Sequence, residues 1–527
     1  MRMKQWVSIK DRKRLLPCII GYLSGLMVHY TVYSNQLMTP DGTIAGFYRL
    51  SGEWELSLGR WGLIVADLLQ GGVINSAFSA MLSLLVLSLS GLLLTKLFNT
   101  TSLLLGTLLC MTLTCSPMAA MILMYPYCAV PYSVSIFFAI AAAYCAFSPC
   151  AHKFAAIGAG VVFLTLSISF YQSNLGTFLI AGAGYVVLYL LNPTHQFMDV
   201  LEGIKKFILA AVAGVGIYAG VMKLTLFMAD VNMADYKNAD QLSPLQSFYQ
   251  LDSSIKATYR TFYQFFFGDQ IVRNAFAEKY IYLGLAVLFL LLIALFTVKV
   301  KRSPAMFFIT TGILLVFPLL ANVIQLAIPG TFVYLLMTGG MMLIVPFLIG
   351  LFNLWYYSSS HTTDTIKKGM SGLFVCLIAG LLWSYSLTNQ NDALVMLSDQ
   401  RQSEQLANRI WSQLEQSEYR NGESTLLITG APHKGNYPTP YPKLMERANE
   451  GARFGTVWET YDGNIDTWYN FFQMHLGVSY KRCTPKQFKE IAATKEYQDM
   501  PLYPEKQSVK KIDGVYVVKL SEISEDL

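Results

Sequence analysis

The sequence predicts a polytopic α-helical membrane protein with about eleven transmembrane helices and a C-terminal, extracytoplasmic small α/β domain. The 527 residues are 54% hydrophobic and only 14% charged, with a mean hydropathy of +0.42. Soluble domains carry roughly 25% charged residues, so this composition excludes an ordinary soluble protein. Apolar runs of about 20 residues alternate with short polar breaks, and a long polar tail follows.

Each apolar run is long enough to cross the roughly 30 Å hydrocarbon core of a bilayer as a helix. Together they define a transmembrane domain over residues 1–388 and a separate tail over residues 389–527. The first run lacks a small-residue cleavage pattern, so we expect a retained signal anchor. The spans are expected near residues 15–33, 73–97, 102–125, 131–148, 154–170, 176–191, 207–229, 280–298, 305–328, 332–356 and 369–387.

Basic residues set the expected orientation, because loops rich in Lys and Arg stay in the cytoplasm. The segment before the first span carries six of them, and the loops near residues 299–302 and 367–368 carry more. The short loops near Pro126 and Pro329 carry none. The N-terminus is therefore expected in the cytoplasm, and an odd number of spans places the tail on the external side.

The first external loop, residues 34–72, contains the most informative pair of residues. Asp41 lies in a Thr-Pro-Asp-Gly sequence and Arg60 in Ser-Leu-Gly-Arg-Trp-Gly, within an amphipathic segment of the kind that lies along a bilayer surface. Chemistry on a lipid-borne phosphate needs a carboxylate to take a proton from a hydroxyl and a guanidinium to hold the phosphate. The structural alternatives are an ordinary turn at Asp41 and an Arg60 that snorkels to the surface.

Polar residues at the external ends of other spans are candidates for substrate binding. Tyr171, Gln172 and Asn174 form one cluster, and Tyr125 and Tyr127 form another. The alternative for the Tyr-Pro-Tyr pair is an aromatic belt at the membrane surface. For Gln172 the two readings are balanced, because amides are uncommon at span ends without a partner.

Two further basic residues complete the candidate phosphate-binding set with Arg60. Lys223 lies well inside an apolar run, which marks a functional site by default, although its side chain also has the length to snorkel to the surface. Arg260 lies in the large external loop, residues 230–279, among aromatic residues suited to sugar rings and prenyl chains. The structural alternative for this loop is a second amphipathic helix on the membrane.

Motifs for protein-bound metals and for nucleotides are absent from the sequence. It contains no Cys-x-x-Cys pair, no His-Glu-x-x-His, no P-loop and no Gly-rich strand-to-helix turn. Seven of the eight cysteines lie in or beside predicted spans, where Cys behaves as a small hydrophobic residue. The net charge of +6 follows the expected distribution of basic loops, so it does not indicate nucleic-acid binding.

The tail pattern predicts a small α/β domain. Residues 394–418 are expected to form an amphipathic helix, residues 424–430 a strand that ends at a glycine turn, and residues 465–476 another helix. Thr484 begins a capping box, and residues 514–520 alternate like a closing strand. We expect this domain to influence acceptor choice rather than to perform chemistry.

The order of these features resembles the type II serotype-converting glucosyltransferase family. The resemblance rests on the basic N-terminus, the early acidic loop with Gly-Arg-Trp-Gly, the Tyr-Pro-Tyr at residues 125–127, Ser-Phe-Tyr-Gln-Ser-Asn-Leu-Gly at 169–176 and the tail segment 500–520. It spans nearly the whole chain. Family members are bacterial integral-membrane enzymes that modify O-antigen or other surface polysaccharides.

The resemblance implies a GT-C type glycosyltransferase of the bacterial inner membrane with a periplasmic tail. Its donor would be a lipid such as undecaprenyl-phosphate glucose, and Asp41 would be the general base of a single displacement. A second carboxylate would have to come from Glu53, Glu55 or Asp67, which leaves the involvement of a divalent cation open. Such enzymes typically work beside a donor synthase and a flippase.

Two other protein classes share the membrane architecture. A transporter or flippase of lipid-linked sugars is also polytopic, but such proteins usually show internal repeats, and the two halves of this sequence show no convincing similarity. A non-enzymatic membrane scaffold would account for the tail. It gives no reason for an acidic, arginine-bearing first loop.

Overall fold

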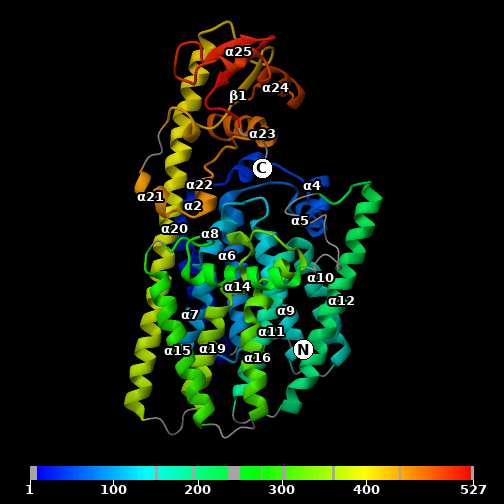
Figure 1. Cartoon of the computed structure of the whole chain (residues 1–527), viewed down its shortest axis with the longest axis vertical. Helices are drawn as coiled ribbons and strands as arrows, with labels where there is room; N and C mark the ends of the chain where they lie inside the picture. The colour runs from blue at the N-terminus through cyan, green and yellow to red at the C-terminus, as the bar shows by residue number, and fades with distance from the viewer. Residues whose placement is uncertain are drawn as a thin grey trace.

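The chain forms a helical bundle with a small α/β domain at one end (Figure 1). The computed structural model describes residues 9–148, 152–192, 195, 197–234, 250–274, 276–299, 304–358, 363–437 and 441–523. We call residues 416–523 the tail domain and the adjoining end of the bundle the tail-side end. The bundle is embedded in a membrane, because its helices are long and apolar.

Helices occupy every apolar run that the sequence predicts to span the membrane. Eight helices in the described ranges are long and apolar enough to cross a bilayer, or nine if the bent pair α7 and α8 counts as one span. Apolar stretches of α1 and α16 are shorter, so the number eleven stays a prediction. The bundle helices are α1 (Ile9–Val28), α6 (Ser76–Leu97), α7 (Leu103–Thr114), α8 (Pro117–Leu123), α9 (Ala129–Phe147), α10 (Lys153–Phe170), α11 (Leu175–Leu191), α12 (Phe197–Ala229), α15 (Glu278–Lys299), α16 (Pro304–Ala321), α19 (Ile344–Ser358) and α20 (Asp364–Glu415).

Close packing in the bundle depends on small residues. A Cβ atom added to Gly91 of α6 would lie 2.8 Å from the Cα of Cys110 in α7. A Cβ atom added to Gly21 of α1 would lie 2.7 Å from the Cβ of the same Cys110. The Thr114 hydroxyl donates a hydrogen bond of 2.8 Å to the Gly21 carbonyl. Small residues and interhelical hydroxyl bonds stabilise helix packing in membranes, so α1, α6 and α7 form one tight unit.

A helix break between α7 and α8 shapes the tail-side end. Pro117 is the first residue of α8, and the Ser116 side chain caps that helix by accepting a hydrogen bond of 3.1 Å from the Ala119 backbone N–H. Proline cannot donate to the preceding turn, so the chain changes direction by 45°. The connection that carries Tyr125 and Tyr127 follows α8 directly, so the bend sets the direction in which the chain enters it.

Helix α20 links the bundle to the tail domain without interruption. It contains 52 residues, which corresponds to a length of about 78 Å at 1.5 Å per residue. Figure 1 shows this yellow helix along the full height of the bundle and into the tail domain. The predicted boundary between residues 388 and 389 lies inside it. The helix predicted at 394–418 is therefore a continuation of the last span, and the division into two domains stays a prediction.

The tail domain contains a four-stranded sheet in the order β2-β1-β4-β3. β1 (Thr425–Thr429) pairs in parallel with β2 (Lys481–Arg482) and β4 (Val515–Lys519), and β3 (Val509–Ile512) pairs with β4 in antiparallel fashion. β1 and β4 lie where the sequence predicts strands. The helix predicted at residues 465–476 corresponds to helix α23 (Tyr461–Phe471) and the π-helical turn η5 (Phe472–Leu476). The capping box of Thr484 opens α24 (Pro485–Ala492).

Buried hydrogen bonds attach the tail domain to α20. Asn449 donates from its backbone N–H and its side chain to the two carboxylate oxygens of Asp392, at 2.8 and 2.7 Å, and Asp392 is 4% exposed. Thr456 donates from its backbone N–H and its hydroxyl to one carboxylate oxygen of Asp399, Oδ2, at 2.9 Å each. Buried carboxylates are costly unless they accept hydrogen bonds. These pairs therefore fix the tail domain against one face of α20.

We expect Asn449→Ala to lower the melting temperature of the detergent-solubilised protein. The change removes the side-chain donor to a buried carboxylate, which costs about 1–3 kcal/mol. Differential scanning fluorimetry measures the effect. Asn436→Ala, at an exposed tail position, is the control. The double variant Asp392→Asn with Asn449→Ala should recover part of the loss, and an unchanged melting temperature in the single variant would contradict this account of docking.

Candidate active site

Asp41 lies in a short helix that is packed against the tail-side end of the bundle. Helix α3 (Pro40–Ala45) has proline at its first position, where the missing N–H costs no hydrogen bond. The backbone N–H and the hydroxyl of Thr39 both donate to the Met124 carbonyl, at 3.0 and 3.3 Å. The Thr-Pro-Asp-Gly sequence is therefore a docked helix start rather than an isolated turn. Asp41 lies in its first turn and is partly exposed.

The tail domain reaches Asp41 directly. The indole N–H of Trp458 donates a hydrogen bond of 3.2 Å to Oδ1 of Asp41. Next to it, the side chain of Asn470 donates a bond of 2.6 Å to the carbonyl of Ile44 in α3. The Asp41 site thus lies between the bundle and the tail domain.

Tyr125 and Tyr127 contribute partly buried phenol groups on the bundle side of Asp41. They lie in the connection between α8 and α9, with ring centroids 6.3 Å apart in an edge-to-face arrangement. Burial raises the pKa of both hydroxyls well above the usual value, and the negative charge of Asp41 raises each pKa further. Both groups therefore remain protonated at physiological pH.

Arg60 lies in an aromatic environment between α4 (Glu53–Ser57) and α5 (Trp61–Gln70). Its Nη1 donates a hydrogen bond of 3.1 Å to the hydroxyl of Tyr132. Its guanidinium lies 5.1 Å from the ring centroid of Tyr171, which stacks on Tyr132 at 4.4 Å. Within the described ranges no carboxylate forms an ion pair with Arg60, and its buried Nε has no hydrogen-bond partner. Such a guanidinium is suited to an incoming anion.

Gln172 holds the loop that carries Arg60. Its side-chain amide donates to the Leu58 carbonyl at 2.6 Å and to the Tyr218 hydroxyl at 3.0 Å. The Tyr218 hydroxyl in turn donates to the Gly59 carbonyl at 3.0 Å. Gly59 adopts a φ of +73°, a left-handed conformation that favours glycine. Gln172 therefore positions the backbone before Arg60.

Asp41 and Arg60 face a common region of the site. The charges of both residues act on Cys128 and on Tyr127, which lie between α8 and α9. Within the predicted site set, the structure thus gathers a carboxylate, a guanidinium and several phenols at the tail-side end. Its members are Asp41, Arg60, Tyr125, Tyr127 and Tyr171.

Three other predicted site residues have different surroundings. Asn174 is buried, donates to the Ser135 hydroxyl at 2.8 Å and accepts from Thr177 at 3.0 Å, so it joins helices. Lys223 is exposed on α12 beside a cavity of about 370 Å³, and Arg260 is exposed on α14 (Leu251–Phe267). In the described parts of the chain, no hydrogen bond or ion pair joins either cation to Asp41.

Two of the three carboxylates considered for a second catalytic role, Glu55 and Asp67, hold the loop together. Glu55 accepts a bond of 2.7 Å from Arg49 and another of 2.9 Å from the Gly52 backbone, which caps α4. Asp67 accepts a bond of 2.7 Å from the Ser51 backbone N–H, and Glu53 is exposed. Over the described residues, no group of three or more His, Cys, Asp or Glu side chains could hold a metal ion.

Sequence reasoning missed three residues of the site. Trp458 is more than four hundred positions from Asp41, and no local pattern links the two. Tyr132 reads as part of an apolar span. The guanidinium of Arg49 lies 5.1 Å from the ring centroid of Tyr127. Arg49 also forms an ion pair with Glu55, and their closeness in the sequence was the only feature that could have suggested this pair.

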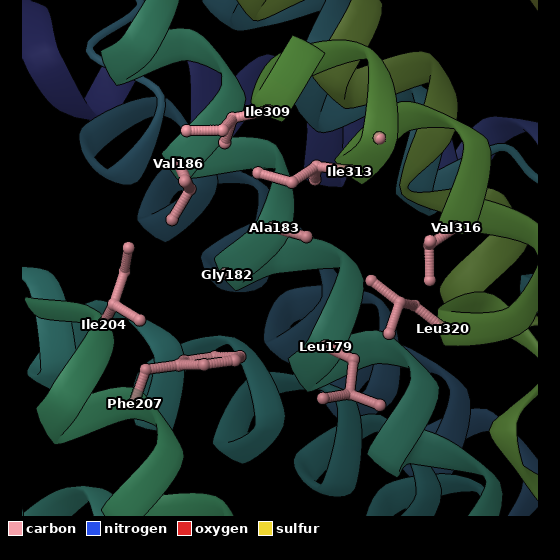
Figure 2. Close-up of a pocket in the computed structure, with 11 residues that line it drawn as sticks. Leu179, Gly182, Ala183, Val186, Ile204, Phe207, Ile309, Ile313, Val316 and Leu320 are labelled. Atoms are coloured by element: carbon pink, nitrogen blue, oxygen red, sulfur yellow. The ribbon is translucent and has the colours of Figure 1, made fainter. Parts of the chain in front are cut away.

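An apolar groove lies between α11, α12 and α16 and has a volume of about 440 Å³. Figure 2 shows the side chains of Phe207 and Ile204, Ile313 and Leu320 directed into the common space. Leu179, near the tail-side end of the groove, lies two helical turns after Gln172 in sequence. The groove therefore extends along the bundle below the Arg60 loop. Its lining is Leu179, Gly182, Ala183, Val186, Ile204, Phe207, Ile309, Gly312, Ile313, Val316 and Leu320.

Comparison with known proteins gives one match. The family model described as "Glucosyl transferase GtrII" matches residues 30–345, which include α3, the Arg60 loop and the apolar groove. No curated protein and no solved structure matches the chain.

We expect Cys128 to resist alkylation by iodoacetamide at pH 8 in the folded, detergent-solubilised protein. Burial raises the pKa of its thiol to about 12, and nearby Asp41 also raises it, although Tyr132 and Arg60 oppose the shift. The thiolate, which is the reactive form, is then scarce at pH 8. Peptide mass spectrometry measures the modification, with a cysteine introduced by Glu53→Cys as the exposed reference. Equal labelling at both positions would contradict the packing around Asp41 and Arg60.

Proposed function

This chain belongs to the glucosyl transferase GtrII family, and we propose that it transfers a glucosyl residue from a polyprenyl-phosphate donor to O-antigen or another cell-surface polysaccharide. The observation that carries the chemical assignment is that Asp41 and Arg60 are attached to the two ends of one short segment: Thr39, two residues before Asp41, donates to the Met124 carbonyl, and Arg60 donates to the Tyr132 hydroxyl. Proton removal and phosphate departure need these two groups on the two sides of one sugar.

The proposed reaction is a single displacement at the anomeric carbon. Asp41 accepts the proton of an acceptor hydroxyl, and the oxygen of that hydroxyl forms the new bond to the sugar. The bond between the anomeric carbon and the donor phosphate breaks, and the phosphate leaves with the electron pair. Arg60 stabilises its growing negative charge, which a partly buried guanidinium does strongly where water is excluded.

Neighbouring residues support these two roles. The protonated hydroxyls of Tyr125 and Tyr127 offer neutral donors to sugar oxygens beside Asp41. Tyr171 places an aromatic face against the Arg60 guanidinium and Gln172 holds its loop. Arg260 and Lys223 remain candidates for contact with donor phosphate as it approaches from the membrane surface.

The apolar groove supports a lipid-linked donor. Its lining consists of apolar side chains and glycines, which suit an apolar isoprenoid chain. The groove extends along the bundle from the region of Gln172. A prenyl chain in this groove would place its phosphate near the tail-side end, where Arg60 lies. Buried apolar area contributes roughly 25 cal/mol per Å², so such a chain supplies binding energy independent of the sugar.

The proposal places the site at the external face of the bacterial inner membrane, in a GT-C type arrangement with a periplasmic tail domain. A donor synthase and a flippase would then supply the lipid-linked sugar. Glu55 and Asp67 already have partners in the loop, so a divalent cation that takes part in the reaction would need other ligands.

We expect Asp41→Asn to lose transfer by about a hundredfold or more, because the amide cannot accept the proton. The assay follows labelled glucose from purified polyprenyl-phosphate glucose to isolated surface polysaccharide, with detergent-solubilised protein. Glu53→Gln, an exposed acid of the same loop, is the matched control and should keep the wild-type rate. Full activity of Asp41→Asn would remove Asp41 from the base role, and absence of product from wild type would favour another donor sugar or a transporter.

We expect Gly312→Phe to raise the KM for a long-chain donor by about tenfold, since the ring would displace several buried methylene groups. Gly312 belongs to the groove lining, and a Cβ atom added there meets no atom within 4 Å, so the backbone leaves room for a side chain to begin. Gly216→Phe, at an equally open position of α12 outside the groove lining, is the control. A donor with a single isoprenoid unit should discriminate less between the variants. Equal KM values with the long-chain donor would exclude this groove.

A further inference from the structure

Trp458 donates a hydrogen bond from a tail-domain side chain to the Asp41 carboxylate. It belongs to the loop between α22 (Glu450–Arg453) and α23. The indole is half-buried, and its ring centroid lies 5.5 Å from that of Phe454. The ring is therefore packed on one side while its N–H points to the bundle.

The loop that carries Trp458 is held on both sides. Before it, the backbone N–H and hydroxyl of Thr456 donate to the buried carboxylate of Asp399, at 2.9 Å each. At Trp458 itself, the backbone N–H donates to the Thr467 hydroxyl at 3.3 Å, and the carbonyl accepts from the Asn464 side chain at 2.6 Å. These bonds fix the backbone from which the indole extends.

The other partner is fixed as well. Helix α3 is docked on the bundle through Thr39 and on the tail domain through Asn470. The bond between Trp458 and Asp41 therefore joins two constrained segments. A contact of this kind determines the orientation of the carboxylate, because rotation of the carboxylate would break it.

We propose that Trp458 is a positioning residue for sugar transfer: its indole N–H orients the Asp41 carboxylate, so that the tail domain completes the active site. This inference rests on the proposed function. It assigns the tail domain a part in the reaction itself, in addition to any part in acceptor choice.

The electrostatic surroundings of Asp41 explain why an additional donor matters. The groups that interact with its charge include Tyr125, Tyr127 and Cys128 from the α8–α9 connection and Tyr334 before α18 (Gly339–Met342). All four are neutral at physiological pH, and the charge of Arg60 also acts on Tyr127 and Cys128. A hydrogen bond from Trp458 favours the ionised carboxylate, which is the form that accepts a proton.

The test compares Trp458→Phe with wild type in the glucose-transfer assay. Phenylalanine keeps an aromatic ring but removes the N–H donor. We expect kcat to fall about tenfold, as for loss of one hydrogen bond to a charged group, while the KM for the donor stays unchanged. The acidic limb of the pH–rate profile should move to higher pH, because the ionised carboxylate loses a donor.

Two further variants separate the explanations. Asn470→Ala removes the neighbouring bond from the tail domain to α3 but leaves the indole donor to the carboxylate in place. Looser docking of α3 should lower kcat, while the pH of the acidic limb should stay at the wild-type value. If it shifts the profile as Trp458→Phe does, docking rather than orientation is responsible and the inference is wrong. A wild-type rate and profile for Trp458→Phe beside an inactive Asp41→Asn would refute the positioning role alone. An active Asp41→Asn would instead refute the proposed base.

Discussion

The docking of helix α3 between the bundle and the tail domain is the constraint on which the candidate site depends. On one side, Thr39 donates two hydrogen bonds to the Met124 carbonyl at the end of α8. On the other side, Asn470 donates to the Ile44 carbonyl. A six-residue helix has little stability of its own, because nucleation is costly and few internal bonds repay it. Its position, and with it the position of Asp41, is therefore decided by these contacts.

The residues around Arg60 hold its guanidinium in place but leave its positive charge without a carboxylate partner in the described chain, so the charge can interact with an anionic ligand. The Arg60 guanidinium is held by one tyrosine hydroxyl and an aromatic face, without a carboxylate ion pair in the described chain. Desolvation of a cation is unfavourable, and a neutral environment repays only part of that cost. An anionic phosphate would supply the missing interaction. The neighbouring Arg49 illustrates the contrast, because its ion pair with Glu55 serves the loop.

Helix α20 couples the bundle to the tail domain through buried carboxylates. Asp392 and Asp399 lie on the part of the helix that follows the predicted last span, and each accepts two hydrogen bonds from the tail domain. Because one continuous helix carries both anchors, the bundle and the loop of Trp458 keep a defined separation. The hydrogen bond from Trp458 to Asp41 is geometrically demanding, and this rigid connection makes it attainable.

The sequence by itself determined the membrane class, the positions of the apolar helices, the strands near residues 425 and 515, and the cap at Thr484, because hydrophobic periodicity and capping are local properties. It also singled out Asp41 and Arg60 by residue type. Only the tertiary structure decided that Gln172 supports the Arg60 loop, that Asn174 joins helices, and that α20 crosses the predicted domain boundary. The contact of Trp458 with Asp41 belongs to the same class, because side chains separated by hundreds of residues meet only through the packing of the whole chain.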